Sequence, residues 1–389
     1  MTTFLGYSDQ WLTERNGIHT AKEISHQPAL WRNLAEILDN QLDSQNANLR
    51  AFLDLLLVEP KLRIILTGAG TSAFVGDAAA PFIQANNRFN VASIPTTDLV
   101  SNPTEYLDPE SPTLLVSFAR SGNSPESVAA VELVDQLVEK SYHLFLTCNP
   151  EGKLSRHAIS HGNAFCLHMP DGSNDQSFAM TSSFSCMLMA AISIFGSESQ
   201  AQRNAHIAQV ATLCEGKITE WQDTVKTLAA QPYQRLITLG SGGLAGVARE
   251  ASLKSLELSA GKVMTAFDSS LGFRHGPKFT ISDQAVVIQY LSNNPYTRQY
   301  DLDLYNEIHN DNQVGIHIAL SGSRLDGELV FELEQPELPD SWLCFPYILF
   351  SQMLAFEKSL QLGLGPDNPC PTGEVNRVVQ GVTIHPYSL

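Results

Sequence analysis

A glutamate, a lysine and a second glutamate lie four and three residues apart in the second half of the chain. They are Glu250, Lys254 and Glu257, and this spacing places all three on one face of a helix. Leu253 and Leu256 border that face with apolar side chains. A carboxylate at such a border loses part of its hydration, which raises its pKa and suits it to moving a proton. Taken alone, the pattern is more typical of an exposed helix face with ion pairs.

A histidine follows these residues in a constrained loop. His275 lies in the segment 271–278, which also holds two glycines and Pro277 and precedes an expected strand. Histidine is the side chain best able to move protons near neutral pH. A single loop histidine is more often structural or exposed, so His275 is a catalytic candidate only together with the carboxylates. His157 and His161 lie four residues apart, but no glutamate follows His157, and we predict no metal and no cofactor.

Hydroxyl groups cluster after two expected strands in the first half of the chain. They follow the turn Gly68-Ala-Gly70, and they recur around Arg120 in a segment that opens a helix. Hydroxyls, a guanidinium and backbone N–H groups at a helix N-terminus are the groups that hold a phosphate dianion. The alternative is that these Ser and Thr residues only cap helices. The predicted phosphate site consists of Gly70, Thr71, Ser72, Arg120, Ser121 and Ser124.

The glycine-rich turn occurs twice. Gly68-Ala-Gly70-Thr-Ser-Ala73 and Gly240-Ser-Gly242-Gly-Leu-Ala245 each follow an apolar segment, which indicates two copies of one α/β unit. Both also fit the glycine pattern of dinucleotide-binding folds. That alternative requires an acidic residue at the end of the second strand, but Pro95-Thr-Thr97 follows there, so we disfavour a dinucleotide.

Short apolar segments alternate with helical ones from residue 62 onward, and this order repeats after about residue 216. Near-continuous apolar strands between helices predict parallel sheets covered on both faces. A polar, helix-like stretch at 197–230 separates the two halves, and we place the domains at 1–44 (helical arm), 45–215 and 216–389. The predicted strands are Arg63–Leu66, Val91–Ile94, Leu114–Ser117, His143–Thr147, Ala164–Leu167, Leu236–Leu239, Ala285–Leu291, Gly315–Leu320 and Leu329–Glu332.

Charge and cysteine content exclude several classes of protein. The 389 residues carry a net charge of -17, which would repel a nucleic-acid backbone, and the N-terminal 60 residues are themselves acidic. The longest apolar run, near 184–195, is too short to span a membrane, and no leader-like segment opens the sequence. The six cysteines show no Cys-x-x-Cys pair and are expected to be free thiols. We therefore expect a cytoplasmic protein that binds neither nucleic acid nor membranes.

A series of segments resembles the sugar isomerase (SIS) domain family, in particular the isomerase half of glucosamine-6-phosphate synthase. Their occurrence in family order over residues 21–280 is far more specific than any one motif. The likeness is greatest to AgaS-type members, described as galactosamine-6-phosphate deaminase/isomerases or tagatose-6-phosphate ketose/aldose isomerases, and it extends to a tail motif at 376–381. The segments are Glu23-Ile-Ser-His-Gln27, Gly68-Ala-Gly70-Thr71-Ser72, Arg120-Ser121-Gly-Asn-Ser124, Thr147-Cys-Asn149, Ala179-Met-Thr181, Glu250-Ala-Ser-Leu-Lys254-Ser-Leu-Glu257 and His275-Gly-Pro277.

The resemblance implies two tandem SIS domains, each a doubly wound, flavodoxin-like α/β sandwich, preceded by the helical arm. It implies that Ser72, Ser121 and Ser124 bind phosphate, joined by Gly70, Thr71, Arg120 and Thr181. Glu257 takes the position of the base that moves a proton between C1 and C2, and Lys254 that of its neighbour on the helix. His275 takes the position of the ring-opening acid/base, which comes from a partner subunit in relatives, so a homodimer or larger homo-oligomer is expected.

Two departures limit what the resemblance implies. The first cysteine is Cys148, so the N-terminal glutaminase nucleophile of the synthase is absent, and no lysine follows Lys358 to form an imine from the tail. The expected activity is therefore conversion of D-galactosamine 6-phosphate to D-tagatose 6-phosphate and ammonia by acid/base groups alone. The alternatives are a simple aldose–ketose isomerase, a deglycase for fructosamine phosphates, and a non-catalytic sugar-phosphate sensor. The configuration at C4 of the sugar stays open.

Overall fold

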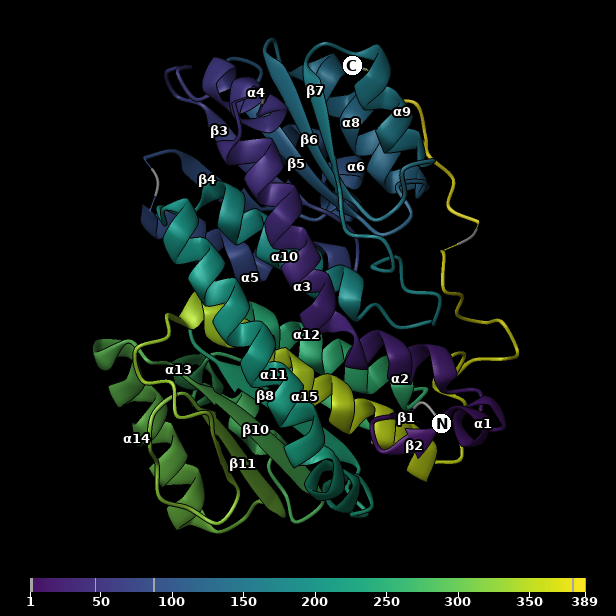
Figure 1. The fold of residues 1–389 in the computed structure, drawn as a ribbon, viewed down its shortest axis with the longest axis vertical. Helices are drawn as coiled ribbons and strands as arrows, with labels where there is room; N and C mark the ends of the chain where they lie inside the picture. Colours follow the sequence, from purple (N-terminus) through teal and green to yellow (C-terminus); the bar gives the residue numbers. More distant parts are fainter. Residues whose placement is uncertain (1–2, 46, 87, 380, 389) are drawn as a thin grey trace. The chain divides into compact units, whose positions relative to one another are not determined.

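A computed structural model of the chain describes residues 3–45, 47–86, 88–379 and 381–388, so Gln380 of the tail motif lies outside the described residues (Figure 1). Contacts divide the chain into two compact units. The first-sheet unit comprises Ala29–Asp175, Ser182–Ile207 and Glu374–Leu389, and the second-sheet unit comprises Met1–Pro28, Gln176–Thr181 and Ala208–Gly373. The domain boundaries drawn from the sequence, at 44/45 and 215/216, stay a prediction.

The first-sheet unit is built on five parallel strands in the order β4-β3-β5-β6-β7. Every residue of β5 is buried, as expected for the centre of a sheet covered on both faces. Ile65, Leu115 and Phe145, from three adjacent strands, pack with Val131 and Val134 of α8 in one core cluster. The strands are β3 (Arg63–Thr67), β4 (Asn90–Ser93), β5 (Thr113–Ala119), β6 (Ser141–Thr147) and β7 (Ala164–His168). The helices are α4 (Asn48–Leu56), α5 (Thr71–Asn86), α6 (Thr96–Ser101), α7 (Pro103–Tyr106), α8 (Pro125–Leu137), α9 (Lys153–Ser160) and α10 (Ser182–Phe195), with a π-helical turn η1 (Asp39–Asp43).

The second-sheet unit repeats this order with the parallel strands β9-β8-β10-β11-β12. Counted within each unit, both sheets have the order 2-1-3-4-5 of flavodoxin-like folds, and the predicted fold class is confirmed. The strands are β8 (Arg235–Gly240), β9 (Met264–Asp268), β10 (Ala285–Leu291), β11 (Ile316–Ser321) and β12 (Val330–Glu332). The helices are α1 (Asp9–Thr13), α2 (Ile18–Ser25), α12 (Gly243–Leu258), α13 (Ser270–Phe273), α14 (Pro295–Asp311) and α15 (Asp340–Gln361), with a 3-10 turn η2 (Pro277–Thr280). The residues of α3 (Gln27–Leu38) and α11 (Gln200–Ala229) are divided between the units.

Two elements of the structure, β9 and the hairpin near the N-terminus, are not among the predicted strands. β9 is an edge strand whose Met264 and Phe267 are exposed, so it lacks the buried apolar run of the central strands β8 and β10. The hairpin joins β1 (Thr3–Phe4) to β2 (Tyr7–Ser8) through Leu5 and Gly6, both at positive φ. Two such residues form the turn that matches strand twist, and Leu is an unusual choice for it. The helical character of the N-terminal region is confirmed.

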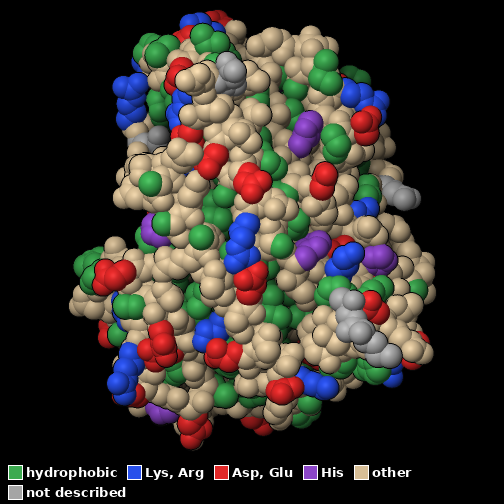
Figure 2. All heavy atoms as spheres, viewed as in Figure 1, with side chains coloured by type: hydrophobic (Ala, Val, Ile, Leu, Met, Phe, Trp, Pro, Cys, Tyr) green, Lys and Arg blue, Asp and Glu red, His purple; other side chains and the backbone are tan. Residues whose placement is uncertain are grey.

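The surface agrees with the acidic composition. On the face drawn in Figure 2, the Lys and Arg side chains lie singly or in small groups among acidic and uncharged ones, without merging into a broad basic area. None of the described helices is long and apolar enough to cross a membrane.

Candidate active site

The first glycine-rich turn connects β3 to α5. A Cβ placed on Gly68 would lie 2.5 Å from the backbone carbon of Ser72, so only glycine permits this close approach. Gly70 has a φ of 55° and open space where its side chain would be. Thr71 and Ser72 are buried at the start of α5, beside that space. The turn thus presents a helix N-terminus and two hydroxyl-bearing residues at the carboxyl end of β3.

The second turn connects β5 to α8 and lies beside the first, because β3 and β5 are parallel neighbours in the sheet. Strand order reverses between them, and ligands of open α/β sheets bind at such a switch point. Ser124 caps α8: its Oγ accepts from Ser127 N at 3.4 Å and donates to Ser127 Oγ at 2.6 Å. Asn149 Nδ2 donates to Ser121 O at 2.8 Å and fixes the turn. The structure thus brings the predicted phosphate residues of both turns to one edge, while their role stays a prediction.

Arg120 has a buried guanidinium at this edge, with 7 % of the residue exposed. Its Nη2 donates to the main-chain oxygen of Arg377 at 2.7 Å. Burial raises the pKa of the nearby Cys148 thiol to about 12, even though the Ser173 hydrogen bond and Arg120 oppose that rise. Cys148 is therefore a neutral thiol near neutral pH and is unsuited to act as a nucleophile.

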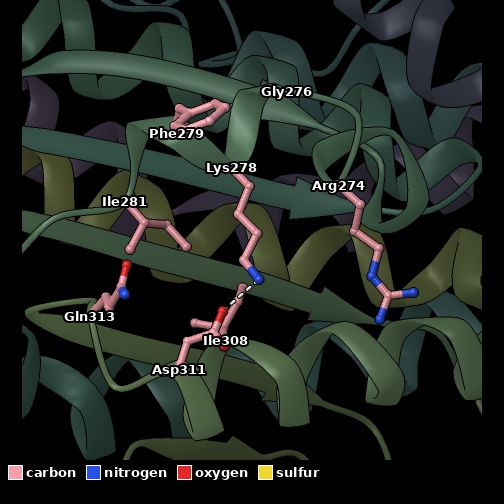
Figure 3. A pocket seen from close by; sticks show the side chains of 8 residues that line it. All are labelled: Arg274, Gly276, Lys278, Phe279, Ile281, Ile308, Asp311 and Gln313. Carbon is pink, nitrogen blue, oxygen red and sulfur yellow. Dashed lines mark ion pairs between the residues drawn. The ribbon is translucent and has the colours of Figure 1, made fainter.

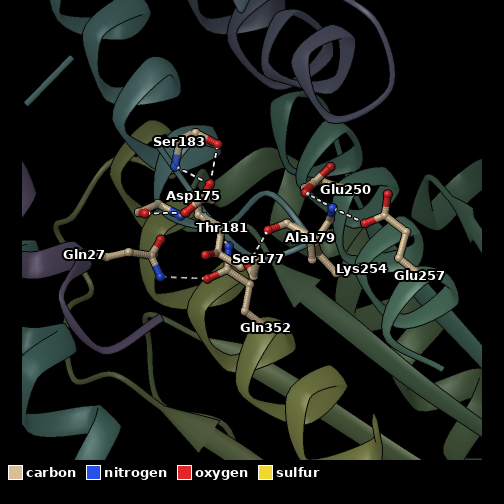
Figure 4. A network of polar contacts seen from close by, with 11 residues as sticks. Gln27, Asp175, Ser177, Ala179, Thr181, Ser183, Glu250, Lys254, Glu257 and Gln352 are labelled. Atoms are coloured by element: carbon tan, nitrogen blue, oxygen red, sulfur yellow. Dashed lines mark hydrogen bonds and ion pairs between the residues drawn. The ribbon is translucent and has the colours of Figure 1, made fainter. Parts of the chain in front are cut away.

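The predicted acid/base residues lie on α12 in the second-sheet unit. Glu250 and Lys254 are fully buried, whereas the Glu257 side chain is 24 % exposed. Lys254 Nζ lies 3.5 Å from Glu250 Oε1 and forms a short ion pair with Glu257 Oε2. Figure 4 shows the Lys254 ammonium between the two carboxylates. The alternative of an exposed, salt-bridged helix face is therefore wrong, and Glu257 alone of the three side chains reaches solvent.

Glu23 of the N-terminal motif binds the segment 176–181 of the second-sheet unit directly, and Gln27 of the same motif is linked to it through Gln352. Glu23 accepts hydrogen bonds from Gln176 N at 2.5 Å, from Ser177 N at 3.2 Å and from the Ser177 hydroxyl. Gln27 Nε2 donates to Gln352 Oε1 at 2.7 Å (Figure 4). In the sequence, Glu23 and Gln27 stand out only as members of a family motif, and their supporting role is not predicted.

Thr181 ends this segment; it is fully buried and belongs to the second-sheet unit, whereas the other predicted phosphate residues belong to the first-sheet unit. Its main-chain oxygen accepts from Gln352 Nε2 at 3.5 Å. Ala179, two residues earlier, packs against Leu258 and Ala355. The contacts with the last residue of α12 and with α15 position Thr181.

His275 is exposed in the loop between α13 and η2. Ion pairs anchor the loop on both sides: Arg274 Nη2 lies 2.5 Å from Glu307 Oε2, and Lys278 pairs with Glu307 and, at 2.5 Å, with Asp311. A cavity of about 280 Å³ lies beside this loop. Figure 3 shows the side chains that line it, with Lys278 directed toward Asp311. Within the described residues, His275 makes no hydrogen bond or ion pair with Glu257. The structure fixes the loop backbone but does not join His275 to the α12 residues.

The switch point of the second sheet is filled by a carboxylate of the chain itself. Asp301 on α14 is fully buried, and its Oδ1 accepts from Ser241 Oγ and Ser270 Oγ, each at 2.6 Å. Its Oδ2 accepts from Ser292 N at 2.9 Å. Gly242, in the turn after β8, has a φ of 59°, close to the 55° of Gly70. An anion already sits in the second copy, which leaves the switch point of the first sheet as the candidate phosphate site.

In the described parts of the chain, no group of three or more His, Cys, Asp or Glu side chains could hold a metal ion. The second-sheet unit offers a carboxylate at the surface of a buried ion-pair network and an exposed histidine on an anchored loop. The first-sheet unit offers a hydroxyl-rich turn pair with a buried arginine.

Comparisons with known proteins place the chain among sugar-phosphate enzymes. Residues 56–195 match the SIS domain. A protein of Shewanella sp. (strain ANA-3) named D-galactosamine-6-phosphate deaminase AgaS is 46 % identical over 383 residues, which are 98 % of this chain and 95 % of that protein. A solved structure from Clostridium novyi NT superposes with a TM-score of 0.96 at 43 % identity and covers 100 % of both chains. The structure of a tagatose-6-phosphate ketose/aldose isomerase from Escherichia coli has a TM-score of 0.88 at 42 % identity, with 96 % of this chain and 98 % of that chain covered.

Proposed function

Since this chain belongs to the SIS domain family, and within it to the proteins named D-galactosamine-6-phosphate deaminase AgaS, we propose that it converts D-galactosamine 6-phosphate and water to D-tagatose 6-phosphate and ammonia. The reaction is an aldose–ketose rearrangement followed by loss of the C2 amine. It needs a group that opens the sugar ring, a base that moves one proton, and an anchor for the phosphate.

Each step has a residue of the appropriate type. His275 exchanges a proton with the ring oxygen and opens the pyranose to the aldehyde. Glu257 takes the proton from C2 and returns it to C1, which leaves an imine at C2. Water adds to this imine, and ammonia leaves as the C2 ketone forms. One water molecule is consumed for each ammonia released, and no metal or organic cofactor takes part.

The burial of the α12 network is the observation that supports this proposal most directly. A proton-transfer base has to be reachable by the substrate and yet be held in one orientation. Glu257 meets both conditions, because it is partly exposed and forms an ion pair with the fully buried Lys254. Glu250 binds the same ammonium from the fully buried side and orients Lys254.

The phosphate is proposed to bind at the switch point of the first sheet. Gly70, Thr71 and Ser72 offer the N-terminus of α5, and Ser121 and Ser124 offer that of α8. The buried Arg120 supplies a positive charge in a chain whose net charge is -17. Thr181, at the end of the segment held by Glu23, is proposed as a further substrate contact.

The decisive experiment measures ammonia and keto-sugar phosphate together. Purified protein is given D-galactosamine 6-phosphate, D-glucosamine 6-phosphate or D-galactose 6-phosphate. We expect ammonia and ketose in equal amounts from the galactosamine compound, and the glucosamine compound reports the preference at C4. Glu257→Gln should lower kcat at least about 100-fold. Glu220→Gln is the matched control, since the exposed Glu220 pairs with Lys217 at the same i, i+3 spacing on α11, and this change should leave kcat unchanged.

A plain isomerase is the second candidate, favoured by the name of the Escherichia coli structure. In that case D-galactose 6-phosphate alone yields ketose, and no amino sugar releases ammonia. Ammonia-free turnover of a phosphorylated fructosamine adduct would favour a deglycase, and binding without turnover of any substrate would favour a sensor. Full activity of the Glu257→Gln variant would reject Glu257 as the base under either catalytic proposal.

We also propose a homodimer or larger homo-oligomer, in which His275 reaches the active site of a partner copy. Large apolar side chains are exposed near this loop on the second-sheet unit, with Phe279 94 % exposed. Such a surface is typical of an interface between subunits. Phe279→Ser should lower the molar mass measured by light scattering, and an unchanged mass would contradict the proposal. The exposed apolar residues are Leu256, Met264, Phe267, Leu271 and Phe279.

The proposed location is the cytoplasm. All six cysteines are free, which suits a reducing compartment, and the proposed substrate is a phosphorylated metabolite. Cell fractionation with an antibody to the chain tests this, and recovery outside the cytoplasmic fraction would contradict it.

A further inference from the structure

The segment that follows α15 has no helix or strand within residues 374–379 and 381–388, yet it forms specific contacts in the first-sheet unit. It is the yellow segment that runs toward the C label in Figure 1. Most of its residues are exposed, so burial alone does not hold it in place. Polar contacts hold it in the first-sheet unit, and several of them involve Arg377.

The Arg377 side chain is bound to a rigid point. Nε donates to the main-chain oxygen of Asp175 at 3.2 Å, and Nη2 donates to the same oxygen. Nη2 also lies 3.5 Å from Asn174 Oδ1. The fully buried Asp175 carboxylate in turn accepts from Ser182 N at 3.1 Å and Ser183 N at 3.0 Å, at the N-terminus of α10. The guanidinium of Arg377 is therefore tied to a loop that is itself locked to a buried helix.

The main chain of Arg377 faces the proposed phosphate site. Its carbonyl oxygen accepts the 2.7 Å hydrogen bond from Arg120 Nη2. Arg120 and Arg377 are 257 residues apart, so this contact exists only in the folded chain. A guanidinium is a planar fork with five N–H donors, and a fixed bond from one nitrogen sets the direction of the others.

A second attachment holds the tail beyond Arg377. Gln136 Nε2 on α8 donates to Tyr387 O at 3.3 Å. Residues 383–387 line a hollow of about 650 Å³ together with Val100, Pro103 and Leu133. The tail is thus attached at Arg377 and again along α6 and α8.

We propose that Arg377 is a positioning residue for phosphate binding. Anchored through its guanidinium on Asp175, it presents its main-chain oxygen to Arg120 and orients that arginine for a phosphate monoester. This inference rests on the proposed phosphate site and assigns a role to the lysine-free tail. It adds no catalytic group, because Arg377 acts through Arg120.

A purely structural role of Arg377 predicts a different outcome. In that case the loss of its side chain would lower the melting temperature and leave substrate affinity unchanged. A positioning role predicts that KM rises while kcat stays nearly constant, because Arg120 contacts a part of the substrate remote from the reacting carbons. It also predicts weaker binding of inorganic phosphate, which needs no chemistry.

The experiment compares full-length Arg377→Ala, Arg120→Ala and the double variant, with Val379→Ala as a matched change at an exposed tail position. The readouts are KM and kcat for D-galactosamine 6-phosphate, the Kd of inorganic phosphate by calorimetry, and the melting temperature. Arg377→Ala should raise KM and Kd about tenfold, the effect of one charged hydrogen bond, with kcat within about twofold. The double variant should be no weaker than Arg120→Ala alone, because both changes remove the same interaction.

Arg377→Lys separates position from charge. It keeps a cation but cannot make the contact by two nitrogens with Asp175, so it should weaken phosphate binding partway to Arg377→Ala. Phosphate binding equal to wild type in Arg377→Lys or Arg377→Ala, or additive losses in the double variant, would overturn the proposal. If Arg120→Ala itself binds phosphate like wild type, the proposed phosphate site fails as well, so the two failures are distinguishable.

Discussion

Replacement of Lys254 by methionine tests the electrostatics of the α12 network. Lys254 and Glu250 are both fully buried, with Nζ 3.5 Å from Oε1. Met keeps the volume and the unbranched stem but removes the charge. Glu250 is then left as a buried carboxylate without its cation, whereas Glu257 can turn to water because a quarter of its side chain is exposed.

The expected loss in free energy of unfolding is about 3 to 5 kcal/mol, the usual cost of breaking a buried ion pair from one side. This corresponds to a fall in melting temperature of roughly 10 °C for a unit of this size. Glu250→Gln in the same chain removes the stranded charge, so the double variant Glu250→Gln/Lys254→Met should recover most of the loss. Glu257→Gln alone should cost less than about 1 kcal/mol, because its pair is partly exposed and the Glu250 pair survives.

Urea unfolding followed by circular dichroism gives the four free energies, and ammonia release gives activity. Activity should stay low in the double variant although stability returns, because the ammonium that orients Glu257 is still missing. A loss below about 1 kcal/mol for Lys254→Met, or no recovery in the double variant, would refute the reasoning that Glu250 is held by Lys254 in a dry environment.

Three further predictions follow from other parts of the structure. Burial raises the pKa of Glu357 from 4.5 to about 7. Between these pH values the folded state keeps the carboxyl proton that the unfolded state has lost, so the protonated Glu357 contributes stability that is lost as pH rises through 7. Glu357→Gln should therefore exceed wild type in unfolding free energy by about 3 kcal/mol at pH 8, and equal it near pH 4.5; a constant difference in urea titrations at both pH values would contradict this. Gly68→Ala should lower the free energy of unfolding by about 1 to 3 kcal/mol, because the new Cβ would lie 2.5 Å from the Ser72 backbone. The control Gly216→Ala on α11, where the Cβ meets open space, should raise it by up to about 1 kcal/mol. Equal melting temperatures of the two variants would argue against the close approach at Gly68. Asp301→Ser should open the second switch point, so that calorimetry finds two bound phosphates per chain in place of one. The control Asp301→Asn should still bind one. A single phosphate in a folded Asp301→Ser variant, or two in wild type or in Asp301→Asn, would contradict the role of the Asp301 carboxylate as the occupant of this switch point.

Sequence patterns located the elements that are buried on both sides. Strands β5 and β10 are mostly apolar and fully buried, and the turns after β3 and β8 carry glycines at fixed spacing. These are local signals, because a buried strand and a tight turn each restrict the residues of one short segment. β9 carries no such signal and is not predicted, because an exposed edge strand places few restrictions on its residues.

The candidate site was predictable only in part. Helical spacing showed that Glu250, Lys254 and Glu257 share a face, but it could not show which of them the fold covers. That depends on the packing of α12 against β8, β9 and α15. Spacing also left open whether Ser124 caps a helix or serves a ligand; in the structure its hydroxyl caps α8, and a role with phosphate stays a prediction.

The sequence by itself determined two parallel α/β units, their glycine turns, and the residue types that gather at the ends of their strands. Only the tertiary structure decided that Glu250 and Lys254 are fully buried, that Asp301 occupies the second switch point, and that Arg377 contacts Arg120. The physical reason is the range of the interactions. Secondary structure follows from neighbours within one or two turns. Burial, the hydroxyl groups that hold Asp301 and the contact of Arg377 with Arg120 depend instead on residues tens to hundreds of positions away, which no local pattern encodes.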